Sequence, residues 1–206
     1  MKVLLINGSP NEKGCTYTAL REAADTIEKE GITAEIFWLG IKPVMSCTDC
    51  GGCTETHRCI FSDDPVNTIL EKAEKSDGFI FGTPVHYAQP SGMITACLSR
   101  AFYAGNCFEY KPGAAVVSCR RGGSATAFDA LNKFFTIANM PVVSSQYWNE
   151  VHGNTPEEVR QDAEGLQTMR TLGRNMAWLL KCIQAGRNSG ILLPAQEEHI
   201  ATNFIR

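Results

Sequence analysis

Val3-Leu4-Leu5-Ile6, followed by Asn7-Gly8-Ser9-Pro10, is the stretch from which the fold of this chain can be read. Four consecutive apolar residues that end in a polar loop are typical of a strand buried on both faces of a parallel sheet. From Thr16 to about Glu30 the apolar residues recur on one helical face, and Gly31 ends the pattern. A strand, a loop and a helix in this order predict an α/β fold.

The alternation of strands and helices continues along the chain. Further strands are predicted at 33–39, 78–82, 114–118 and 141–144, and further helices at about 65–75, 91–104, 125–139 and 155–182. Ser62-Asp63-Asp64-Pro65 is a strong helix start, because capping side chains precede a proline suited to the first turn. Repeated crossovers of this kind require a parallel sheet with helices on both faces.

The length of 206 residues fits one domain, on a prior of about 150 residues per domain. Residues 40–62 show neither a helical nor a strand period, so they form a cysteine-rich excursion from that domain. We therefore predict a domain over residues 1–185 that includes the excursion. Residues 186–206 are predicted to form a C-terminal tail, which could pack on a neighbouring subunit or be disordered.

The composition limits the class of protein. Apolar residues make up 44% of the chain and charged residues 20%, which predicts a globular fold. The net charge of −3 gives no overall attraction to nucleic acid. No apolar run reaches the roughly 18 residues that span a bilayer, and the apolar start is too short for a signal peptide. We expect a cytoplasmic protein with neither a membrane nor a nucleic-acid partner.

The loop after the first strand carries four hydroxyl side chains and leads into a helix N-terminus. These side chains belong to Ser9, Thr16, Tyr17 and Thr18. Free amides and the helix dipole favour an anion there, so the loop suits a phosphate monoester. It matches neither the Walker loop nor G-x-G-x-x-G. An ordinary strand-to-helix turn with capping hydroxyls is the alternative.

Two later segments follow other predicted strands. Residues 82–92 combine prolines with the flat side chains of His86 and Tyr87, which suit a planar heterocycle. In residues 118–124, Arg120-Arg121 supplies positive charge and Gly122-Gly123 permits close approach of the backbone. Each segment alone could be a packed turn or a solvated edge. Because the carboxyl ends of parallel strands meet at one edge of the sheet, the three loops together predict one flat, phosphorylated ligand.

Four of the nine cysteines lie within 13 residues, in the order Cys47, Cys50, Cys53 and Cys59. Three cysteines at C-x2-C-x2-C spacing with a fourth nearby are typical of a [4Fe-4S] cluster, because one loop can then supply all four thiolates. A zinc site more often pairs two short motifs across a longer spacer, and it remains an alternative. Reduced thiols without a metal are a second alternative. The other cysteines in the later part of the chain, Cys97, Cys107, Cys119 and Cys182, are expected to be small core residues, and His57 is expected to be exposed.

These motifs carry a resemblance to a known family. They are Gly8-Ser9-Pro10 with Gly14 and Thr16, the four cysteines, Asp63-Asp64, Gly82-Thr83-Pro84-Val85-His86-Tyr87, Ser91-Gly92, and Tyr147-Trp148-Asn149 with His152-Gly153. Over nearly its whole length the chain resembles the flavodoxin-like NADPH-dependent FMN reductase superfamily, and more narrowly the iron-sulfur flavoproteins. The resemblance implies a flavodoxin-like three-layer sandwich with a five-stranded parallel sheet of order 2-1-3-4-5. It also implies an FMN cofactor and a homodimer or a dimer of dimers.

The resemblance assigns the FMN phosphate to the hydroxyls of the first loop and the isoalloxazine to the other two segments. The residues expected to contact FMN are Ser9, Pro10, Asn11, Thr16, Tyr17, Thr18, Pro84, Val85, His86, Tyr87, Ser118, Arg120, Arg121, Gly122 and Gly123. No catalytic acid is assigned, because flavin N5 can take a hydride without a protein base. Three residues depart from the family pattern: Cys15 replaces an asparagine, and Thr95 and Ser99 replace a lysine and an aspartate.

The predicted function is electron transfer by an FMN-containing oxidoreductase, between a [4Fe-4S] cluster and FMN, with a small acceptor such as a quinone, oxygen or peroxide. The redox partner would be a ferredoxin-like donor or NAD(P)H. One alternative is an NAD(P)H-dependent FMN, quinone or nitro reductase without a functional cluster. Another is a non-enzymatic zinc- or FMN-binding module. The resemblance to the iron-sulfur flavoproteins implies a crossed arrangement, in which the cluster of one chain faces the FMN of another. Tyr147, Trp148 and the C-terminal tail are expected near the contact.

Overall fold

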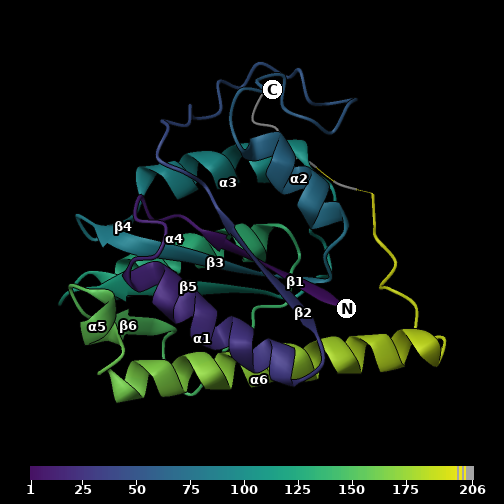
Figure 1. Ribbon diagram of the computed structural model, residues 1–206. Helices are drawn as coiled ribbons and strands as arrows, with labels where there is room; N and C mark the ends of the chain where they lie inside the picture. Colours follow the sequence, from purple (N-terminus) through teal and green to yellow (C-terminus); the bar gives the residue numbers. More distant parts are fainter. Residues whose placement is uncertain (199, 201, 203–206) are drawn as a thin grey trace.

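A computed structural model describes residues 1–198, 200 and 202 of the chain. Its central sheet has five parallel strands in the order β2-β1-β3-β5-β6 (Figure 1). The strands are β1 (Lys2–Asn7), β2 (Thr33–Trp38), β3 (Gly78–His86), β5 (Gly113–Cys119) and β6 (Glu150–His152). A two-residue strand, β4 (Gln89–Pro90), pairs antiparallel with β3. Without β4 the order is the predicted 2-1-3-4-5, and the flavodoxin-like sandwich is confirmed.

Helices cover both faces of the sheet because the residues of each strand point alternately to opposite sides. Val3 and Leu5 of β1 pack with α1 (Cys15–Lys29) and α6 (Ala163–Asn188). Leu4 and Ile6 pack on the other face, together with α2 (Val66–Glu74), α3 (Gly92–Ala104) and α4 (Ser124–Ile137). In Figure 1, α1 and α6 lie below the sheet and α2 and α3 above it. The four apolar residues at the start of the chain are therefore fully buried on both sides, as their sequence predicts.

The excursion over residues 40–62 contains no helix and no strand. It leaves β2 at its carboxyl end and runs over α2 and α3, on the upper side of Figure 1. None of the helices in the described part of the chain combines the length and the apolar character needed to cross a membrane.

The predicted fifth strand at 141–144 is wrong. At this position the structure has only an isolated bridge between Val142 and Gly113, and the fifth strand is β6, at 150–152. Between Val142 and β6 the chain leaves the sheet. Just before β6, the side-chain amide of Asn149 donates to the Ala115 carbonyl of β5 at 3.0 Å and holds the chain next to β5 again. The edge next to β5 is thus built from two separate pieces.

The predicted helix over 155–182 is also wrong in its continuity. The structure divides it into α5 (Pro156–Val159) and α6, because Asp162 accepts a hydrogen bond from the Gly165 amide at 2.9 Å and caps a new helix. Helix α6 then continues to Asn188, so residues 186–188 belong to the helix and not to the tail. In the tail, Ile191, Leu192 and Leu193 are exposed. Its packing on a neighbour is a prediction that falls partly outside the described residues.

Candidate functional site

The first loop is held in place by its own polar groups. The Asn7 side chain donates to the Glu12 carbonyl at 2.9 Å and accepts from the Ser9 amide at 3.1 Å. The Ser9 hydroxyl accepts from the Asn11 amide at 3.1 Å, and the Trp38 indole donates to the Ser9 carbonyl at 2.8 Å. The loop therefore has a fixed shape through contacts within the chain, and Trp38 is a supporting residue that the sequence did not reveal.

Helix α1 begins directly after this loop and leaves its first amides free of side-chain caps. Its N-cap is Gly14, which has no side chain to accept a hydrogen bond, and there is no acidic residue in the first turn. The Thr18 hydroxyl donates back to the Gly14 carbonyl at 3.2 Å. Uncapped amides at the positive end of a helix suit a phosphate group. The first loop thus fits the phosphate of FMN.

The second predicted loop is largely a strand. Strand β3 continues to His86, and a two-residue turn at Tyr87 and Ala88 leads back into β4. Both turn residues have positive φ, 52° and 60°, as in a type I′ hairpin, although neither is a glycine. The Tyr87 side chain is fully exposed at the tip. The expectation of a loop over 82–92 is corrected: proline at position 84 does not end the strand, because β3 still pairs with β5 there.

The third segment meets this hairpin. Gly123 has φ of 87° and is the N-cap of α4, and a Cβ placed on it would lie 2.8 Å from the Ala88 Cα. Only glycine permits this approach of the two backbones. The Thr16 hydroxyl, in the first turn of α1 directly after the first loop, lies 2.8 Å from the Ser118 hydroxyl of β5. Contacts between first and third segments and between second and third therefore bring all three together at one edge of the sheet.

The predicted FMN contacts differ in exposure. The buried ones are Ser9, Thr16 and Ser118. The exposed ones are Pro10, Asn11, His86, Tyr87, Arg120, Arg121 and Gly122. Tyr17, Thr18, Pro84, Val85 and Gly123 are half-buried. Buried hydroxyls beside an uncapped helix start, together with exposed flat and basic side chains, match a ligand whose phosphate is enclosed and whose ring lies near the surface.

Two cysteines near the third segment make polar contacts that the sequence did not indicate. The Cys119 thiol lies 3.3 Å from Nδ1 of His152, and the Cys15 thiol donates to the Gly153 carbonyl at 3.7 Å. Burial raises the pKa of both thiols. Cys15 is thus a neutral donor to the segment after β6, which gives a structural role to the residue that departs from the family pattern.

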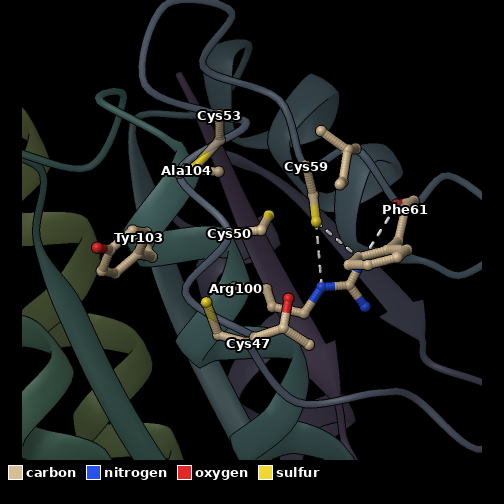
Figure 2. Close-up of a pocket in the computed structure, with 11 residues that line it drawn as sticks. Cys47, Cys50, Cys53, Cys59, Phe61, Arg100, Tyr103 and Ala104 are labelled. Atoms are coloured by element: carbon tan, nitrogen blue, oxygen red, sulfur yellow. Dashed lines mark hydrogen bonds between the residues drawn. The ribbon is translucent and has the colours of Figure 1, made fainter.

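The four cysteines of the excursion line one pocket. Arg100, Tyr103 and Ala104 of α3 form part of its wall, together with Ile60 and Phe61 of the excursion (Figure 2). In the described part of the chain, no three His, Cys, Asp or Glu side chains are grouped so as to hold one metal ion. A [4Fe-4S] cluster binds each of its four thiolates at a separate iron. A set of four sulfur donors around one pocket fits such a group in its donor chemistry.

Arg100 supplies the positive charge of this pocket. It is 2% exposed and forms an ion pair with Asp64. Burial alone would lower the pKa of the Arg100 guanidinium, but hydrogen bonds to Asp64 and Cys59 outweigh burial and raise it. The sequence indicated Asp64 as part of a helix start and of a family motif, but not as a partner of Arg100. Asp64 does lie at the helix start, where it accepts from the Val66 amide at 3.1 Å.

The cysteines outside the pocket have different surroundings. Cys97 and Cys119 are buried as predicted, whereas Cys107 is half-buried and Cys182 is exposed, so the prediction that Cys182 is a core residue is wrong. Burial, with the Asp64 carboxylate nearby, raises the pKa of Cys97 to about 12. His57 is exposed, as expected.

Comparisons with known proteins show the family to which this chain belongs. Residues 1–155 match the family model of NADPH-dependent FMN reductases. An iron-sulfur flavoprotein of Methanocaldococcus jannaschii is 35% identical over 193 residues, which cover 89% of this chain and 100% of that protein. Among solved structures, a flavone reductase has a TM-score of 0.70 at 17% identity. The matched region covers 89% of this chain and 64% of the flavone reductase chain. A flavodoxin from the domain Archaea has a TM-score of 0.60 at 14% identity. The matched region covers 88% of this chain and 99% of the flavodoxin.

The matched range, residues 1–155, extends from β1 through the third segment and contains the four cysteines. The chain therefore belongs to the NADPH-dependent FMN reductase family and is a flavodoxin-like, flavin-dependent oxidoreductase that binds FMN.

Proposed function

We propose that this oxidoreductase is an iron-sulfur flavoprotein, which carries a [4Fe-4S] cluster in the four-cysteine pocket and passes electrons between the cluster and FMN to a small acceptor. The observation that supports the proposal best is that Cys47, Cys50, Cys53 and Cys59 line one pocket on the surface of α3 (Figure 2). When bound, the cluster supplies one-electron transfer, and FMN supplies transfer of one or two electrons.

The residues of the chain would bind and orient FMN at the edge of the sheet. The uncapped amides of α1 and the hydroxyls of Ser9, Thr16 and Thr18 would hold the phosphate. The backbone of the hairpin at Tyr87 and Ala88 would face the ring. Arg120 and Arg121 would place positive charge beside it, where negative charge develops on a reduced flavin.

Helix α3 separates the two sites within one chain. Ser91, its N-cap, donates its hydroxyl to the Gly8 carbonyl at 2.7 Å and so lies at the flavin end. Tyr103 lines the cysteine pocket near the other end of the helix. At about 1.5 Å per residue, these two positions are about 18 Å apart along the helix. This separation supports the proposal that the cluster of one chain acts on the FMN of its partner in a homodimer or a dimer of dimers.

An NAD(P)H-dependent reductase without a functional cluster is the second candidate. The description of the matching family, NADPH-dependent FMN reductase, favours it, and that match also covers the FMN segments. In this case NAD(P)H would deliver a hydride to flavin directly, and the four cysteines would be reduced thiols.

Iron and acid-labile sulfide, measured per chain after anaerobic reconstitution, decide between the two candidates. The proposal expects roughly four irons and four sulfides per chain, with their loss in Cys50→Ala. Cys182→Ala is the matched control, because it removes an exposed cysteine outside the pocket. If the wild-type protein binds FMN but neither iron nor sulfide, the first candidate is excluded and the reductase without a cluster remains. Equal iron in wild type and Cys50→Ala would exclude the four-cysteine pocket as its site.

A further inference from the structure

The guanidinium group of Arg100 is directed at the cysteine-rich excursion and at Asp64, which follows it. Its Nη2 and Nε donate to the Cys59 sulfur at 3.0 and 3.2 Å. The remaining hydrogen bonds go to the Met45 carbonyl at 3.2 Å, to the Phe61 carbonyl at 3.1 Å and to the Asp64 carboxylate. Figure 2 shows the side chain below the Phe61 ring and next to the Cys59 sulfur. One buried arginine thus joins α3 to both sides of Cys59.

The backbone of Cys59 is fixed from a second helix. Its amide donates to the Asn67 side chain at 2.9 Å, and the Asn67 amide group donates to the Cys59 carbonyl at 2.8 Å. Asn67 belongs to α2, so α2 holds the main chain of Cys59 while α3 holds its sulfur. By contrast, Cys47 and Cys50 are exposed, and Cys53 is half-buried like Cys59. Among the described residues, only the Cys59 sulfur of these four accepts hydrogen bonds from a side chain. The four corners of the pocket are therefore unequal, and Cys59 is the corner that the fold prepares in advance.

We propose that Arg100 is a positioning residue that fixes the Cys59 sulfur before any group binds and makes the reduction potential of a bound cluster more positive. The second half of this inference rests on the proposed function. Hydrogen bonds to a ligand sulfur stabilise the more negative, reduced state of an iron-sulfur group, and a nearby positive charge does the same. The Asp64 carboxylate opposes this effect because it partly neutralises the guanidinium charge.

Three substitutions separate geometry from charge. Arg100→Lys keeps the charge but loses the planar fork that reaches the sulfur and the carbonyls together. Asp64→Asn keeps Arg100 and an oxygen that can accept from the Val66 amide, but removes the negative charge. Arg58→Gln is the control, because Arg58 lies in the same segment and pairs with Glu74 at 2.7 Å. Its guanidinium hydrogen bonds go to Glu74 and the His57 carbonyl, not to a sulfur.

The first measurement is the midpoint potential of the cluster in reconstituted full-length protein, followed by electron paramagnetic resonance during a redox titration. Arg100→Lys is expected to lower the potential and Asp64→Asn to raise it, while Arg58→Gln leaves it unchanged. An unchanged potential in Arg100→Lys, or a shift no larger than that in Arg58→Gln, would overturn the tuning role.

The second measurement needs no cluster. Amide hydrogen exchange at Cys59 in the metal-free chain is expected to be on the order of tenfold faster in Arg100→Lys than in wild type, as for loss of a hydrogen bond to a charged group. Exchange in β1 reports whether the core remains folded in each variant. Unchanged exchange at Cys59 in Arg100→Lys would overturn the positioning role. A wild-type chain that binds no iron and sulfide would overturn the proposed function alone, and the exchange rates would then decide the positioning role.

Discussion

The hydroxyl groups of Thr16 and Ser118 lie 2.8 Å apart, although 102 positions separate the two residues in the sequence. Thr16 stands in the first turn of α1 and Ser118 near the end of β5, so this hydrogen bond joins the proposed phosphate end of the FMN site to its ring end. Both residues are almost completely buried. This buried contact fixes the start of α1 relative to the end of β5.

Replacing Thr16 and Thr18 together by Val is expected to weaken FMN binding. Each hydroxyl would contribute roughly 1.5–3 kcal/mol as a hydrogen bond to a charged phosphate. Fluorescence quenching during FMN titration of the apoprotein gives the Kd. Thr26→Val is the control, because Thr26 lies on the same helix and its hydroxyl donates only to the Glu22 carbonyl. An unchanged Kd in the double variant would rule out these hydroxyls as the phosphate site.

Replacing Arg120 and Arg121 by Ala is expected to make the flavin potential more negative and to weaken binding of a phosphorylated nicotinamide. Both side chains are exposed at the carboxyl end of β5, where positive charge would stabilise a reduced flavin. The flavin potential and the KM for NADPH are measured beside Arg160→Ala, which removes an exposed arginine paired with Glu157. If the flavin potential and the KM both equal those of wild type, Arg120 and Arg121 are solvent-exposed residues without a role in the flavin site.

A mixed dimer tests the crossed arrangement of cluster and flavin. One chain carries Cys50→Ala, and the other carries Thr16→Asp, which places a negative charge where the phosphate would bind. Crossed transfer leaves one intact pair, a cluster facing the only bound flavin, so a cluster-dependent donor still reduces that flavin. Stopped-flow absorbance of the flavin follows the reduction. Loss of reduction in the mixed dimer would place the transfer within one chain.

Glu35 is expected to contribute to stability above acidic pH. Hydrogen bonds from Lys2 and then Lys72, each at 2.5 Å, lower the pKa of the Glu35 carboxyl from its ordinary value of 4.5. A lowered pKa in the folded state means that the stabilisation is complete above that ordinary value and is lost as the pH falls through the folded-state pKa.

Because Glu35 is partly exposed, Glu35→Gln is expected to cost roughly 0.2–1 kcal/mol at pH 7 and less at pH 3. Urea unfolding at the two pH values measures the difference, with Glu71→Gln on the exposed face of α2 as the control. A cost that is larger at pH 3 than at pH 7 would contradict the assigned pKa shift.

The layered fold could be predicted because its signals are local. Val3 to Ile6 are apolar without interruption, and a strand buried on both faces needs nothing else. The fifth strand could not be placed in this way. Val142 and Val143 have the stronger strand character, but pairing along β5 is completed by Glu150–His152, after Asn149 binds the Ala115 carbonyl.

The candidate site was predictable to the extent that its residues follow strands or share a motif. The four cysteines were found by their spacing, but the contact between Arg100 and Cys59 spans 41 positions and no local pattern indicates it. The turn at Tyr87 and Ala88 was missed for a related reason. Neither residue favours positive φ, so the turn depends on contacts such as that of Ala88 with Gly123.

The interruption between Val142 and Glu150 also affects how copies of this chain can associate. A long, regular outer strand offers a row of free amides and carbonyls onto which another chain can add a strand, with aggregation as a frequent result. At this border the outer strand is only three residues long, and the preceding piece is a single bridge. A second chain therefore finds no continuous template there, and association of subunits on this side is expected to occur through packed side chains and not through an extended sheet.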